Sequence, residues 1–189
     1  MAPLLLVNTA VYSCVVGFVA VVYVAVQHGE PPSPLPAQSA KDYAPVFYVT
    51  VASLLLLYIF LFNQSRTVFL ELVRLQRAHR EKKIEEKPTL AGLKYGNDNL
   101  QILAANRAAG NLMEQLIPFL PALYGYATFV SVSGAVTHGW LWVFFRSYYP
   151  NVFQKPFPTL FLSTLPAYTC IFSMMGITIY TIATSTSAV

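Results

Sequence analysis

The feature that most constrains this chain is a series of apolar runs, each close to the length that crosses a bilayer. A membrane-spanning helix needs about 20 consecutive apolar residues. The expected spans cover residues 4–26, 44–62, 99–129, 136–149 and 159–183. Charged residues make up 11% of the sequence and hydrophobic residues 56%, whereas soluble domains carry about 25% charged residues. The sequence therefore predicts an all-α protein, a polytopic transmembrane bundle with about five spans.

The first run could be confused with a cleavable signal peptide. It has no basic residues ahead of it, and its roughly 23 apolar residues exceed the usual length of a signal-peptide core. We therefore expect a true span. Four prolines follow within six residues, from Pro31 to Pro36, and such a cluster favours a stiff, extended connection. The predicted organisation is an N-terminal helix with a proline-rich loop (1–43), followed by a membrane domain (44–189).

The basic residues are concentrated in one segment. Eight of the twelve Lys and Arg lie within residues 66–98, which predicts that this segment occupies the cytoplasm-like side of the membrane. Five spans then place Met1 on that same side and Val189 on the opposite side. We expect no nucleic-acid partner, and no address signal distinguishes an endomembrane from an organellar membrane.

Local signals predict where several elements end. The helical pattern of the second span continues past the membrane as a charged, solvated helix, supported by pairs such as Arg77 with Glu81. Pro88 is expected to end it. Gly134 and Gly139 are expected to mark a turn before the fourth span. The two cysteines, Cys14 and Cys170, lie in separate apolar runs, and no histidine or cysteine has metal-ligand spacing.

A polar stripe interrupts the third span. Arg107, Asn111 and Glu114 are spaced i, i+4 and i+7, which places them within about 60° of one another on a helix. Ionisable groups at this depth are expensive and are expected to face the bundle interior or a polar cavity. Two interpretations follow. In one, Arg107 and Glu114 pair with each other, bridged by Asn111; in the other, the stripe binds a zwitterionic ligand.

Two motifs resemble those of a known family. Residues 107–114, RAAGNLME, followed by a proline, are similar to the signature of the MAPEG family, the membrane-associated proteins of eicosanoid and glutathione metabolism. Residues 144–149, FFRSYY, resemble the family's Arg-x-x-Tyr segment. The resemblance covers residues 44–183, so the first span would be an addition to a four-helix unit.

The resemblance implies a homotrimer that binds glutathione between protomers. The implied contacts come from Arg107, Asn111 and Glu114 in the third span, and from Arg146 and Tyr149 in the fourth. In such proteins an Arg near the sulfur stabilises the glutathione thiolate by lowering its pKa, and the thiolate attacks a lipid electrophile or reduces a peroxide. No metal is implied.

The sequence also departs from the family pattern. Residues 154–168, where the thiolate-stabilising Arg is expected, contain no Arg; Lys155 is the only cation there. Gln115 stands where the family commonly has an aromatic residue, and Phe153 stands where a second Tyr is expected. The predicted function is therefore a glutathione-binding, catalytically degenerate membrane protein with a structural or lipid-binding role. The alternatives are an active glutathione-dependent transferase or peroxidase, and an accessory subunit of a large organellar membrane complex.

Overall fold

The computed structural model describes residues 39–85, 87–96 and 99–186, which form helices and connecting turns without a strand. The all-α prediction is thus confirmed. The expected first span, with Cys14 and the proline-rich loop, lies outside the described residues. In chain order the elements are η1 (Ala40–Tyr43), α2 (Ala44–Arg80), α3 (Leu90–Tyr95), α4 (Leu100–Phe129), α5 (Val132–Ser147), α6 (Tyr149–Phe153) and α7 (Phe161–Thr186).

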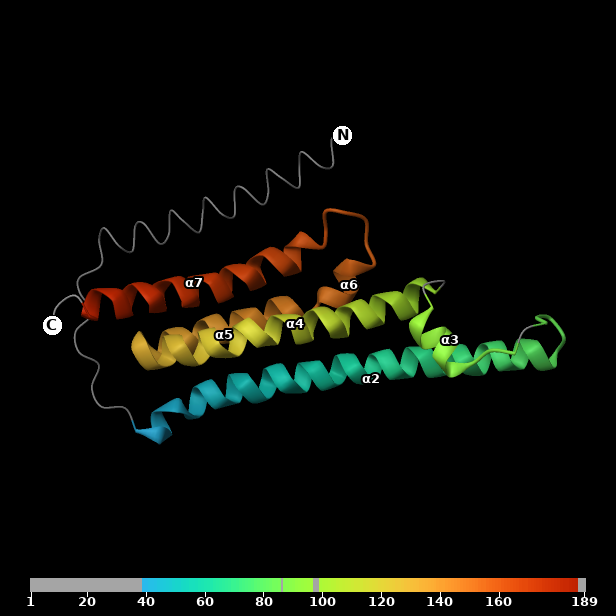
Figure 1. Ribbon diagram of the computed structural model, residues 1–189, viewed down its shortest axis with the longest axis horizontal. Helices are drawn as coiled ribbons and strands as arrows, with labels where there is room; N and C mark the ends of the chain where they lie inside the picture. Colours follow the sequence, from blue (N-terminus) through green and yellow to red (C-terminus); the bar gives the residue numbers. More distant parts are fainter. Residues whose placement is uncertain (1–38, 86, 97–98, 187–189) are drawn as a thin grey trace.

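The four long helices lie side by side as a bundle (Figure 1). Helices α4 and α5 are central, because each packs against the other and against both α2 and α7. The rings of Phe119 in α4 and Trp142 in α5 stack with centroids 3.9 Å apart, and both side chains are fully buried. Four alanines of α4 are also buried, at positions 104, 105, 108 and 109. Their small side chains let neighbouring helices approach closely.

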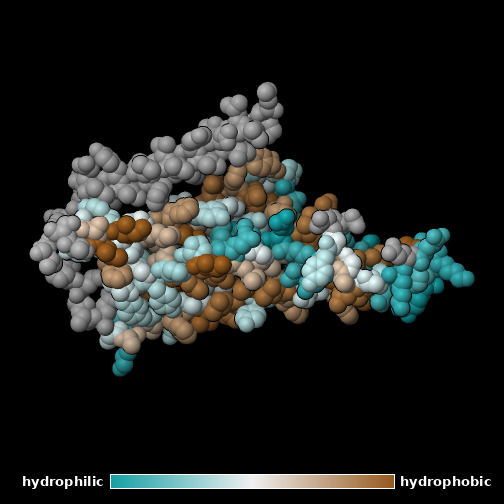
Figure 2. Space-filling model, viewed as in Figure 1, coloured by the Kyte–Doolittle hydropathy of each residue, from teal (hydrophilic) through white to brown (hydrophobic). Residues whose placement is uncertain are grey.

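Helix α2 is much longer than a bilayer requires. Its 37 residues span about 55 Å at 1.5 Å per residue. It runs past the ends of its neighbours (Figure 1), and the projecting tip is hydrophilic (Figure 2). The prediction that this helix ends at Pro88 is wrong. The helix ends at Arg80, because Lys82 adopts a left-handed φ of 57° that a right-handed helix does not allow. Beyond that end, Glu81 forms an ion pair with Lys83 rather than the predicted pair with Arg77.

Two stretches among the described residues, Ala40–Arg80 and Phe161–Ser185, are long and apolar enough to cross a membrane by themselves. Helix α4 has sufficient length, but its polar stripe lowers its hydropathy, and α5 has only 16 residues. The count of five spans stays a prediction.

Helix α5 begins four residues earlier than the expected position 136. Ser131 caps its N-terminus, accepting a hydrogen bond from the Gly134 amide at 3.1 Å. The prediction that Gly134 and Gly139 form a turn is therefore wrong, since both lie within the helix. Gly139 is a packing residue: a Cβ built there would lie 2.6 Å from Val49 Cγ1 and 3.0 Å from Leu123 Cδ1. The glycine lets α2, α4 and α5 meet closely.

Candidate functional site

The polar stripe of α4 lies on an open face of this chain. Asn111 is half-buried, whereas Arg107 and Glu114 are exposed. Among the described residues no ion pair joins Arg107 to Glu114. The interpretation in which these two pair inside the bundle is therefore wrong for the single chain. The buried face of α4 is occupied instead by alanine, leucine and phenylalanine, so the polar face turns outward.

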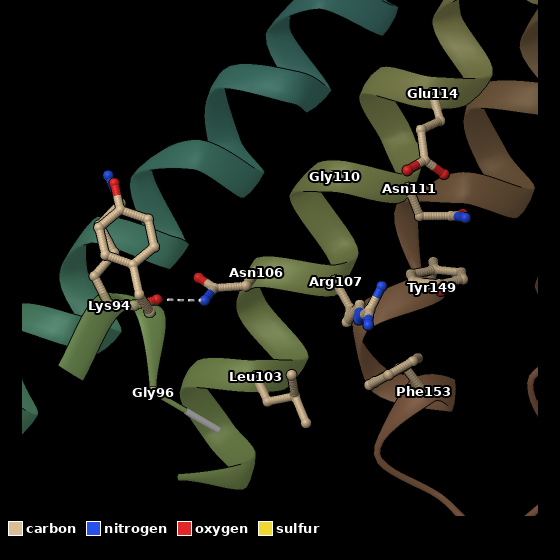
Figure 3. A pocket seen from close by; sticks show the side chains of 11 residues that line it. Lys94, Gly96, Leu103, Asn106, Arg107, Gly110, Asn111, Glu114, Tyr149 and Phe153 are labelled. Atoms are coloured by element: carbon tan, nitrogen blue, oxygen red, sulfur yellow. Dashed lines mark hydrogen bonds between the residues drawn. The ribbon is translucent and has the colours of Figure 1, made fainter. Parts of the chain in front are cut away.

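The stripe forms one wall of a cavity of about 540 Å³. Side chains from α4 line it on one side, and residues from α3 and α6 complete it (Figure 3). The lining residues are Lys94, Tyr95, Gly96, Leu103, Asn106, Arg107, Gly110, Asn111, Glu114, Tyr149 and Phe153. Two cations, one carboxylate and two amides thus share one space of the size that small-molecule sites usually have.

Arg146 lies one layer deeper, behind the cavity wall. Its side chain is fully buried, and its Nη2 donates a hydrogen bond to Asn111 Oδ1 at 2.5 Å. The guanidinium carbon lies 4.3 Å from the centre of the Tyr149 ring, a cation–π contact that partly offsets desolvation of the charge. The structure therefore brings Arg146, Asn111 and Tyr149 together. Arg146 itself does not line the cavity; it fixes two side chains that do.

Arg146 is incompletely satisfied. Its Nε and Nη1 are buried without a hydrogen-bond partner within the described part of the chain. The neighbouring buried Gln115 is also unpartnered at both its amide oxygen and its amide nitrogen. Unsatisfied buried polar groups are costly, and each one in a native structure calls for a specific explanation. The interior beside the stripe is thus polar beyond what the packing of this chain requires.

A short hydrogen-bond chain attaches α3 to the bundle. Gln64 Nε2 in α2 donates to Asn106 Oδ1 at 2.8 Å, and Asn106 Nδ2 donates to the Lys94 carbonyl at 3.0 Å. The second bond is drawn in Figure 3. Thr89 caps α3 by accepting from the Gly92 amide. Neither Lys94 nor Asn106 was predicted as a site residue. In the sequence, the only indication that Asn106 belongs to the site is its position directly before Arg107.

The segment expected to hold a thiolate-stabilising cation contributes none to the cavity. Lys155 is exposed in the turn after α6 and does not line the cavity. Phe153, from α6, presents an aromatic ring without a hydroxyl at the cavity edge. The cations that line the cavity are Arg107 and Lys94.

Fold and site together define a helical membrane bundle with a polar cavity on the face of one central helix. The MAPEG family model matches residues 46–180, and this chain belongs to the MAPEG family. The resemblance expected from the two sequence motifs is confirmed, and with it membership of a membrane protein family of glutathione and eicosanoid metabolism. Among curated proteins and solved structures, none matches this chain.

Proposed function

We propose that the α4 cavity binds glutathione and that the protein acts as a non-catalytic, structural or lipid-binding component of its membrane. The observation that supports this most is the lining of the cavity. Arg107 and Lys94 can pair with the two carboxylates of glutathione, Glu114 with its ammonium, and Asn111 with a peptide group. Charge-assisted hydrogen bonds of this kind are the strong ones, and their arrangement along one helix face suits an extended tripeptide.

We infer that a second protomer completes the site. Arg107 and Glu114 are exposed in the single chain, yet they lie on a helix that packs against α2, α5 and α7. Charged groups at membrane depth require a polar or protein surrounding. Assembly of the chain as a homotrimer would cover the stripe and enclose the bound peptide between protomers.

The absence of catalysis is inferred from the cations near the cavity. Activating a thiol requires a positive charge beside the sulfur, which favours the thiolate. Arg107 and Lys94 are required for the carboxylates in this proposal, and the Arg146 guanidinium is turned towards Asn111 and Tyr149. No further described cation lines the cavity. Binding is therefore supported better than thiol transfer.

The binding proposal is tested by titrating reduced glutathione into the purified full-length protein by calorimetry. A hydrogen bond to a charged group contributes about 1.5–3 kcal/mol, so Arg107→Gln is expected to weaken binding by roughly 10- to 150-fold. The matched control is Arg77→Gln, since Arg77 is exposed on the projecting part of α2. Absence of binding by the unmodified protein, or equal loss in both variants, would overturn the proposal.

Turnover distinguishes the proposed function from an active transferase. The proposal predicts no glutathione consumption with a generic aromatic electrophile beyond the uncatalysed rate. Measurable turnover that is lost in Arg107→Gln would instead support an enzyme. Stoichiometric co-purification with a larger membrane assembly, without glutathione binding, would favour an accessory subunit.

A further inference from the structure

A second cavity lies between α2 and α3, and it has a different character from the first. Its volume is about 530 Å³. It is lined by Phe62, Gln64, Ser65, Arg66, Val68, Phe69, Leu90 and Lys94, which we call the α2–α3 groove. We propose that this groove binds one anionic phospholipid, with its phosphate against Arg66 and an acyl chain along the apolar wall.

The apolar wall of the groove is unusually open. Phe62 is 71% exposed, Phe69 is 61% exposed and Leu90 is 55% exposed. These three large hydrophobic side chains all line the same groove, so they offer an acyl chain a continuous apolar contact. Their distribution over two helices forms a channel, and a flexible acyl chain can fill such a channel.

The cations at the groove are not neutralised within the described residues. Among the described residues, ion pairs join Arg74 to Glu71 and Lys83 to Glu81. Glu71, the carboxylate nearest in sequence to Arg66, is therefore already paired. The Lys94 ammonium also borders the groove, but the proposed function assigns it to a carboxylate of glutathione, so Arg66 makes the phosphate contact. A lipid phosphate supplies the missing negative charge, and guanidinium groups bind phosphate with particular affinity.

The depth of the groove matches a lipid headgroup. Phe62 is the last residue of the apolar run that began at Ala44, and the basic segment begins four residues later at Arg66. The groove thus lies where the hydrocarbon region gives way to the interface, and basic pockets at this level bind anionic headgroups. Helix α3 is held there by the Asn106 bond to the Lys94 carbonyl, so the second wall is fixed in place.

The test is native mass spectrometry of the full-length protein in detergent, with an equimolar mixture of a phosphatidylglycerol and a phosphatidylcholine that carry identical acyl chains. The expected result is one retained phosphatidylglycerol per chain, in preference to phosphatidylcholine. Arg66→Gln is expected to reduce that preference roughly five-fold. The control, Arg80→Gln, removes an equal charge outside the groove and is expected to leave the preference unchanged.

A second variant tests the acyl chain. Phe69→Ser keeps Arg66 and removes part of the apolar wall, so it is expected to reduce retention of both lipids. If Phe69→Ser has no effect and excess inorganic phosphate displaces the lipid, the groove is an anion site and the proposal is wrong. Equal retention of the two lipids would also overturn the proposal. So would a mass spectrum in which the unmodified protein retains a second protein chain and Phe69→Ser does not. Arg66 does not line the α4 cavity, so Arg66→Gln is expected to bind glutathione as tightly as the unmodified protein. Measuring both ligands on this variant therefore tests the lipid proposal separately from the proposed function.

Discussion

Filling the α4 cavity at Gly110 would separate ligand binding from folding. Gly110 lies on the cavity wall, and a Cβ built at this position meets no atom within 4 Å. Gly110→Ala is therefore free of clashes and removes the helix penalty of glycine, which is about 1 kcal/mol. We expect Gly110→Ala to unfold at a higher temperature than the unmodified protein.

Gly110→Leu keeps the same helix advantage but extends a branched side chain into the cavity. A leucine in a helix points back toward the preceding turn, which here carries Asn106 and Arg107. The bound peptide would lose at least one charge-assisted contact, worth about 1.5–3 kcal/mol. Glutathione affinity is expected to fall by roughly 10- to 150-fold, with no loss of thermal stability.

Two measurements check this prediction: calorimetric titration with reduced glutathione, and thermal unfolding in detergent followed by tryptophan fluorescence. Gly110→Ala serves as the matched control, since it tests the backbone change with little added volume. Unchanged affinity in Gly110→Leu would place the glutathione site elsewhere. A lower unfolding temperature in Gly110→Ala would show that Gly110 is packed against protein, in this chain or in the proposed partner protomer, and does not face the space for the ligand.

Three further substitutions test the packing behind the site by the same unfolding assay. Gly139→Ala brings a methyl group against Val49, and overpacking of this kind costs about 1–3 kcal/mol of stability. Combining it with Val49→Ala should restore part of the lost stability. Losses that simply add in the double variant would contradict the contact. Arg146→Met removes an incompletely satisfied buried cation, so the unfolding temperature should stay the same or rise. Glutathione affinity should fall, because Asn111 loses its hydrogen-bond donor. Unchanged affinity would refute the positioning role of Arg146. Ser131→Ala removes the α5 cap and should cost about 1 kcal/mol.

Local signals in the sequence were sufficient for the helix that carries the site. Helix α4 spans Leu100–Phe129, against an expected 99–129, because Asn99 caps its N-terminus and one apolar face continues along the helix beside the polar stripe. The spacing of Arg107, Asn111 and Glu114 predicted one face, since helical periodicity alone determines it. The family resemblance, rather than periodicity, implied that Arg146 and Tyr149 belong to the same site, and the structure places Arg146 against Asn111 and Tyr149.

Features that depend on contacts between distant segments could not be predicted this way. Helix α3 is only six residues long and is held by the hydrogen bond from Asn106 of α4 and by packing against α2, so helix propensity alone does not predict it. Gly139 has the composition of a turn, and only the proximity of Val49 reveals its packing role. Whether a polar stripe faces inward or outward depends on where neighbouring helices dock, which periodicity does not specify.

The most direct test of the account is a cryo-electron microscopy structure of the full-length protein in a lipid nanodisc with reduced glutathione. We predict a trimer with peptide density between protomers, in contact with Arg107, Asn111 and Glu114, and with Arg146 behind Asn111. A single chain whose α4 stripe faces lipid, or a trimer with glutathione absent from that stripe, would contradict it.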